Sequence, residues 1–121
     1  MPLKRIRLEL ARTAETPNGS PYCGYEFTAP LDRSGKLDLE QWMRVKDKCT
    51  VRRFWKSTTD EHGRLAHHPG NRWAFAWPGG DSEEPISRFD QHAFVEGEYV
   101  SVTEHDGVER PFRIVDIRPA A

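Results

Sequence analysis

The residues best suited to binding chemistry form one short segment in which basic residues flank aromatic ones. It reads Arg52-Arg53-Phe54-Trp55-Lys56, and the pair Arg72-Trp73 repeats the combination further along the chain. Guanidinium groups bind phosphates through paired hydrogen bonds, and aromatic rings stack on unpaired bases. We therefore predict a platform for single-stranded nucleic acid, with the candidate binding residues Arg52, Arg53, Trp55, Arg72 and Trp73.

A structural explanation of the same residues competes with this hypothesis. Trp55 and Trp73 can be core rings, with Arg53 and Arg72 extending to water or pairing with acidic residues. The direction of the two indole rings separates the alternatives. Buried rings behind a salt-bridged surface contradict a platform, and exposed coplanar rings flanked by arginines support it.

Metal binding and cofactor binding are not predicted. The five histidines lack ligand spacing, because neighbours such as His67 and His68 point to opposite faces of a strand and zinc needs three or four converging ligands. No glycine-rich phosphate loop or dinucleotide fingerprint is present. We therefore expect no metal and no cofactor.

Covalent catalysis is not predicted either. Cys49 lies among Lys46, Lys48 and Arg52, an electropositive setting that lowers a thiol pKa, but it also falls on the apolar side of a predicted helix exit, where a buried cysteine is inert. The sequence has no G-x-S-x-G elbow. We expect no catalytic residue.

The charges of the chain balance overall but are unevenly distributed. Its 18 basic and 19 acidic residues give a net charge of -1, so attraction for nucleic acid must be local. Basic residues concentrate between Arg44 and Lys56, and acidic residues between Asp81 and Glu109. This pattern predicts a positive side and a negative side, which could also pair between copies of the chain.

The size and hydropathy of the chain set its class. Its 121 residues suit a single domain covering residues 1–121. No uncharged run is long enough for a secretory signal or a membrane span, so we expect a cytoplasmic protein that binds no membrane. In a reducing compartment Cys23 and Cys49 are expected to be free thiols.

Period-two alternation predicts most of the strands. Ile6, Leu8 and Leu10 share one face of a strand over residues 4–12, and a second strand covers residues 25–31. Further strands are predicted at 51–56, 64–68 and 72–77, followed by a hairpin of 98–104 with 111–118. Loops are predicted at 13–24, with a hairpin turn at 60–63 and an exposed acidic loop at 78–85.

One helix is predicted over about residues 39–48. Asp38 can cap its first amides, with Gln41 at the capping-box position. Its apolar stripe consists of Leu39, Trp42, Met43, Val45 and Cys49, and we expect this stripe to pack across one side of a sheet.

The C-terminal third carries one resemblance. Residues 94–102, followed by Asp106-Gly107 and residues 112–115, resemble the strand-entry and hairpin pattern of small SH3-like barrels, and the whole chain resembles small bacterial proteins. With six or seven strands, one helix and no βαβ alternation, we predict a mainly antiparallel α+β fold. Its form would be a small curved sheet, or an SH3-like partly open barrel, with one packed helix.

Together these observations predict a non-catalytic binding or interaction module with a basic-aromatic face. Its expected partner is a nucleic acid, single-stranded in the first hypothesis above, or a protein. Two alternatives remain: a small enzyme with a pocket lined by Trp73, Trp77 and His92, and a homo-oligomer held together by complementary charged sides.

Overall fold

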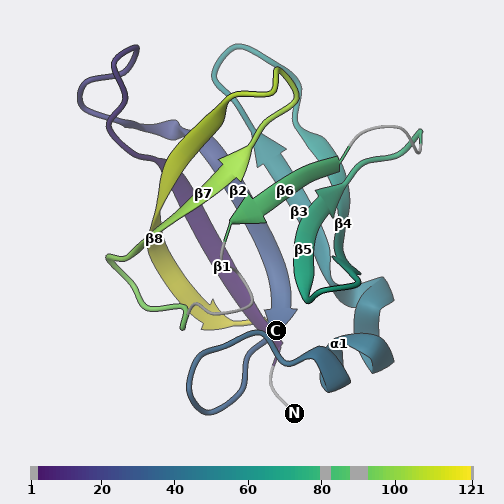
Figure 1. Ribbon diagram of the computed structural model, residues 1–121. Coiled ribbons are helices and arrows are strands. Elements are labelled where there is room, and N and C mark those ends of the chain that lie inside the picture. The colour runs from purple at the N-terminus through teal and green to yellow at the C-terminus, as the bar shows by residue number, and fades with distance from the viewer. Residues whose placement is uncertain (1–2, 80–82, 88–92, 121) are drawn as a thin grey trace.

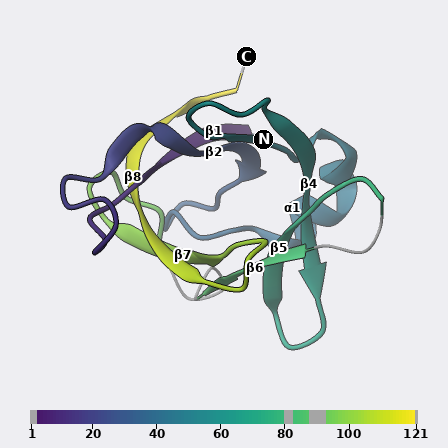
Figure 2. The same cartoon turned by 90° about the horizontal axis from the view of Figure 1, so that it is seen from above.

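A computed structural model describes residues 3–79, 83–87 and 93–120 of the chain. Eight antiparallel strands follow one another around a closed barrel, seen from the side in Figure 1 and from above in Figure 2. The strands are β1 (Leu3–Leu10), β2 (Ser20–Pro30), β3 (Thr50–Phe54), β4 (Glu61–His68), β5 (Arg72–Ala76), β6 (Glu83–Ser87), β7 (Tyr99–Thr103) and β8 (Glu109–Pro119). The predicted class, a mainly antiparallel barrel with one helix, is confirmed.

The barrel is closed rather than partly open because β1 pairs on both sides. Ile6 faces Phe27 of β2 on one side and Ile117 of β8 on the other. An eight-stranded barrel has an interior just wide enough to be filled by side chains. Here the filling is aromatic: the ring of Tyr25 lies 4.9 Å from that of Phe75 and 5.2 Å from that of Phe112. The apolar residues that alternate along the predicted strands do face this core.

The prediction of a loop over 13–24 is wrong at its C-terminal end, where β2 already begins at Ser20. The register of β1 against β2 jumps from Glu9–Gly24 to Leu10–Ser20, so the three residues between them form a bulge without partners on β1, in which Cys23 still packs into the core. A bulge accommodates Pro21, which has no N–H to donate to a ladder. It also turns Tyr22 outward.

The turn between β3 and β4 lies at residues 55–58 and not at the predicted 60–63. The Thr58 amide donates to the carbonyl of Trp55 at 3.0 Å, and Ser57 adopts a φ of 68°. Gly63 is a strand residue: a Cβ there would lie 2.7 Å from the ring of Trp77, so glycine makes room for packing rather than for a turn.

The predicted acidic loop at 78–85 ends in a strand. Residues 83–87 form β6 between β5 and β7, with Glu84 and Ile86 directed into the barrel, while residues 80–82 lie outside the described residues. Charge alone suggested full exposure for this segment, but strand periodicity buries every second residue.

The helix is shorter than predicted and lies at an end of the barrel rather than across a sheet. α1 (Leu39–Val45) continues into the 3₁₀ turn η1 (Lys46–Lys48), near both termini in Figure 1. Asp38 caps it as predicted, accepting from the Gln41 amide at 3.1 Å. Leu39, Trp42 and Val45 pack against the core, but Met43 is exposed, contrary to the prediction. Within the described residues no helix is long and apolar enough to span a bilayer.

Candidate functional site

The structure does not bring the five predicted binding residues together. Trp73 is buried at the α1 end of the barrel, with its ring edge-on to Trp42 at 5.6 Å. Arg72 is exposed at that same end and donates from Nε to the Pro69 carbonyl at 3.0 Å. Trp55 follows the opposite end of β3. The single platform predicted from the sequence is therefore divided between two ends of the molecule.

Arg52 and Arg53 are divided as well, because adjacent residues of a strand point to opposite faces. Arg52 lies outside the barrel, where its guanidinium bonds Asp60 at 2.8 Å and Glu26 at 3.5 Å. Arg53 lies inside, with Nη2 3.1 Å from Glu104 and its guanidinium carbon 4.2 Å from the centre of the Trp55 ring. Trp55 also meets Arg53 at the barrel end, but it shares the outer surface with Arg52.

That surface is a depression of about 470 Å³ on the wall formed by β1, β2 and β3, here called the outer hollow. Phe54 forms its floor. The guanidinium carbons of Arg7 and Arg52 lie 4.3 and 5.0 Å from the Phe54 ring centre, and a Cβ on Gly24 would lie 3.0 Å from that ring. The packing fixes both cations over an apolar floor.

The rim of the outer hollow carries the groups that remain available to a ligand. Tyr22, turned outward by the bulge of β2, is 69% exposed. Trp55 is partly buried beside it, and Lys56 is exposed with no ion-pair partner among the described residues. An exposed ring next to an unpaired ammonium group can stack on a base and hold a phosphate.

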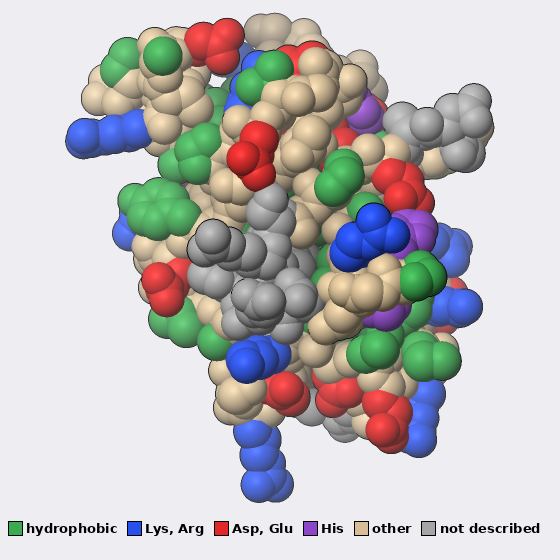
Figure 3. Space-filling model, in the orientation of Figure 1, with side chains coloured by type: hydrophobic (Ala, Val, Ile, Leu, Met, Phe, Trp, Pro, Cys, Tyr) green, Lys and Arg blue, Asp and Glu red, His purple; other side chains and the backbone are tan. Residues whose placement is uncertain are grey.

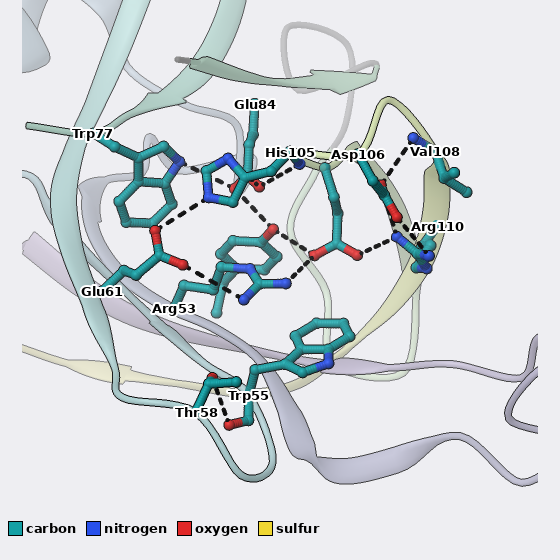
Figure 4. A network of polar contacts seen from close by, with 12 residues as sticks. Arg53, Trp55, Thr58, Glu61, Trp77, Glu84, His105, Asp106, Val108 and Arg110 are labelled. Carbon is teal, nitrogen blue, oxygen red and sulfur yellow. Dashed lines mark hydrogen bonds and ion pairs between the residues drawn. The ribbon is translucent and has the colours of Figure 1, made fainter. Parts of the chain in front are cut away.

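A second group of polar residues fills the barrel end opposite α1, drawn in Figure 4, and is called the inner polar layer. Six strands contribute its members, which point inward from a strand or, in the case of Glu104, directly follow one: Tyr25, Arg53, Glu61, Glu84, Glu104 and Arg110. Sequence analysis missed it, although the signal was present. Inward-facing residues recur at every second position of a strand. Glu104 comes two residues after the inward-facing Val102, Glu84 comes two residues before Ile86, and Arg110 comes two residues before Phe112.

The Tyr25 hydroxyl links the two buried carboxyl groups of this layer. It lies 2.8 Å from Glu84 Oε1 and 2.8 Å from Glu104 Oε2. One hydroxyl donates only one proton, so the second contact requires a proton on a carboxyl group. Arg53 and Arg110 contact Glu104 at 3.1 and 2.9 Å. Burial raises the pKa of Glu84, which favours a proton on that carboxyl group.

His105 connects Glu84 to the surface. Its backbone amide donates to Glu84 Oε2 at 3.0 Å and its Nδ1 lies 3.4 Å from the same oxygen, while Nε2 lies 3.1 Å from the exposed Glu61. The Trp77 indole donates to Glu84 Oε1 at 3.2 Å. Burial, and after it the neighbouring Glu104 and Glu84, raise the pKa of Tyr25, which stays protonated. Most polar groups of the layer thus bond one another, but Nε of Arg53 is buried without a hydrogen-bond partner among the described residues.

The space above the inner polar layer is small. A depression of about 210 Å³ is lined by Arg53, Trp55, Glu104, His105, Asp106 and Arg110. The guanidinium of Arg110 already bonds Glu104 and Asp106, and Arg53 bonds Glu104 and approaches Glu61 at 3.7 Å. Because these donors are engaged within the protein, the layer is built to close the barrel more than to hold a ligand.

The structure also bears on three other kinds of site considered above: a reactive cysteine, a metal site and an enzyme pocket. Cys23 and Cys49 are buried and unpaired, and burial together with Asp47 raises the pKa of Cys49 to about 11, so the lowering suggested by its basic neighbours is wrong. Within the described residues no three His, Cys, Asp or Glu side chains are placed to hold a metal. Of the predicted enzyme pocket, Trp73 and Trp77 are buried and His92 lies outside the described residues.

The predicted separation of charge into two sides is also not seen. Glu104 points into the barrel and pairs with Arg53 and Arg110, and Figure 3 shows basic and acidic side chains interspersed over the visible face. No family model, no curated protein and no solved structure matches this chain. The function of the chain is therefore inferred from the positions of the residues in the outer hollow and the inner polar layer.

Proposed function

We propose that this protein is a non-catalytic binding module that holds single-stranded nucleic acid in the outer hollow. One observation carries the proposal: a largely exposed tyrosine, Tyr22, lies beside Trp55 and the unpaired cation of Lys56 in one depression. An exposed ring and an unpaired cation that line the same depression offer a stacking surface and a phosphate contact. Of the residues predicted from the sequence, Arg52 and Trp55 remain in this proposal.

Binding in the outer hollow combines stacking with phosphate contacts. A base stacks on Tyr22, which contributes about 1–3 kcal/mol per base in such sites. Lys56 approaches the phosphate, and Arg52 adds positive potential that Glu26 and Asp60 only partly cancel. Because the net charge of the chain is -1, attraction is confined to this region and weakens as salt rises.

A cytoplasmic setting is part of the proposal. It supplies single-stranded nucleic acid, and it keeps the two unpaired cysteines reduced.

The test measures fluorescence anisotropy of a labelled oligothymidylate titrated with the protein at low and moderate salt. Tyr22→Ala is expected to weaken binding about tenfold, within the range of one lost stacking contact. Lys56→Ala is expected to lower the steepness of the salt dependence by about one unit. Lys36→Ala, an exposed lysine before α1, is the matched control and should bind like the original chain.

Tyr22→Phe keeps the ring and should retain binding. The proposal fails if the original chain does not bind the oligonucleotide at low salt, or if Tyr22→Ala and Lys36→Ala bind equally well.

A further inference from the structure

We propose that the nucleic-acid site continues past Pro21 into a second depression, so that its ligand is a strand long enough to occupy both. This inference rests on the proposed function and extends it. The second depression, here called the flank hollow, has a volume of about 610 Å³ and lies between the β1–β2 loop and β8. The residues that matter in it are Arg12, Ser20, Pro21, Tyr99 and Arg113.

The flank hollow repeats the chemistry of the outer hollow on different strands. Tyr99 of β7 and Arg113 of β8 are direct cross-strand partners. Their neighbours Val100 and Phe112 are buried in the barrel, so Tyr99 and Arg113 both point outward. Tyr99 is 56% exposed. A ring and a guanidinium are therefore paired on the surface, as Tyr22 and Lys56 are on the other side of Pro21.

The flank hollow is also electropositive. Arg12 and Arg113 are exposed, and no carboxylate of the described residues lies within ion-pair distance of either. The acidic residue that lines the hollow is Glu9, and its carboxylate lies 2.8 Å from Arg7. The two arginines thus keep their charge for a ligand, whereas Arg7 and Arg52 share theirs with carboxylates of the protein.

The two hollows are neighbours. Pro21 lines both, and its carbonyl accepts from Nη2 of Arg7 at 3.2 Å, which holds the bulge between them in place. In Figure 1 the β1–β2 loop projects from the barrel beside β8, and Figure 3 shows basic and hydrophobic side chains together on the flank beneath it. A mononucleotide fills one hollow only. Alternating rings and cations on both sides of one ridge suit a single-stranded oligonucleotide, whose bases and phosphates alternate in the same way.

The experiment compares labelled oligothymidylates of about 4 and about 16 nucleotides, the range over which single-strand sites vary. With the long strand, one molecule per chain is expected, and Tyr99→Ala, Arg113→Ala and Tyr22→Ala should each weaken binding about tenfold, because each removes one of two linked contacts. With the short strand, two molecules per chain are expected, and each variant should remove binding at one hollow while the other is unchanged.

Controls separate binding from folding. Tyr99→Phe keeps the ring and should bind the long strand like the original chain, and Lys36→Ala should do the same. Because Tyr99 and Arg113 are exposed, all variants should unfold at the same denaturant concentration as the original chain.

The outcomes distinguish the two proposals. If Tyr22→Ala weakens the long strand but Tyr99→Ala and Arg113→Ala do not, the extended path is wrong and the function in the outer hollow stands. If Tyr99→Ala and Arg113→Ala weaken the long strand but Tyr22→Ala does not, the outer hollow is not the site and the path between the hollows is overturned. Absence of binding at any length overturns the proposed function itself.

Discussion

Arg52 and Arg53 are consecutive residues of β3 that lie on opposite sides of the barrel wall. The Arg53 side chain is 14% exposed and meets Glu104, which is 2% exposed, whereas the Arg52 side chain is 35% exposed and meets Glu26 and Asp60 near water. The same residue types therefore build an inner polar layer and an outer hollow. The side of the barrel wall on which an ion pair lies therefore decides what the pair can do.

Inside the wall, each charge must have a partner. Removing a guanidinium and a carboxylate from water costs several kcal/mol per ion, which only close pairing and additional hydrogen bonds offset. Outside the wall, water and salt screen each pair, and its net contribution is about 0–1 kcal/mol. An outer cation can therefore exchange a carboxylate for a phosphate at little cost, while an inner cation cannot.

The largest expected effect on the free energy of unfolding comes from replacing the central carboxylate of the inner polar layer, compared with the same replacement outside the barrel wall. Glu104 holds Arg53 and Arg110 inside, and Glu26 lies within 3.7 Å of Arg7 and Arg118 and 3.5 Å of Arg52 outside. We expect Glu104→Gln to lower the free energy of unfolding by about 3–5 kcal/mol, and Glu26→Gln by less than about 1 kcal/mol. Urea denaturation measures both, and equal losses would contradict the comparison.

A smaller effect is expected from the Tyr25 hydroxyl. Tyr25→Phe keeps the stacked ring but removes one hydrogen bond from each buried carboxyl group, leaving Glu84 Oε1 with Trp77 and Glu104 Oε2 with Arg53, and we expect it to cost about 1–3 kcal/mol. Tyr22→Phe on the outside removes an exposed hydroxyl and should change the free energy of unfolding by less than about 0.5 kcal/mol. A Tyr25→Phe variant as stable as the original chain would show that the hydroxyl is not needed to join the two carboxyl groups.

The pH dependence of the free energy of unfolding should also differ between a residue of the inner polar layer and one on the outer face. Burial raises the pKa of Glu84 above its ordinary value of 4.5, so the folded chain holds this proton more tightly than the unfolded chain. The resulting stabilisation is complete below pH 4.5 and is lost as the pH rises through the raised pKa. We therefore expect the free energy of unfolding of the original chain, relative to Glu84→Gln, to fall with rising pH in denaturant titrations. Glu83→Gln, on the exposed face of β6, should leave that fall unchanged.

The smallest effect is expected at Arg52. Arg52→Ala should lower the free energy of unfolding by at most about 1 kcal/mol at low salt, through loss of its pairs and of its packing on Phe54. The part due to the pairs should disappear at high salt, since exposed charges are screened. Urea denaturation at two salt concentrations measures this, and a larger loss that persists at high salt would place Arg52 among the buried pairs.

The sequence predicted the strands whose apolar residues alternate without interruption. Ile6, Leu8 and Leu10 face the core as expected, and Trp73, Phe75 and Trp77, whose shared face was predicted without deciding between core and binding surface, also face it. Where the alternation passes through charged residues the prediction failed, because a glutamate was taken as a sign of exposure. Glu84 and Glu104 occupy inward positions that only their arginine, tyrosine and histidine partners make tolerable, and those partners come from distant parts of the chain.

The candidate site was predicted in part, for a related reason. Composition identified Arg52 and Trp55 within a basic-aromatic segment, but it could not separate Arg52 from Arg53 without the register of β3. Tyr22 was missed because its exposure depends on a bulge in β2, which arises from the pairing with β1 and leaves no local signature beyond Pro21. Tyr99 and Arg113 were missed because each becomes meaningful only next to the other across β7 and β8.

The pairing of β1 with β8 has a consequence for how this protein can meet other chains. Every described strand already has a neighbour on each side, so no row of unsatisfied backbone amides and carbonyls is presented along an edge. Along the described strands a partner polypeptide therefore finds no free edge for a strand of its own or for edge-to-edge aggregation. Recognition must come from side chains on the wall and from the loops at its two ends.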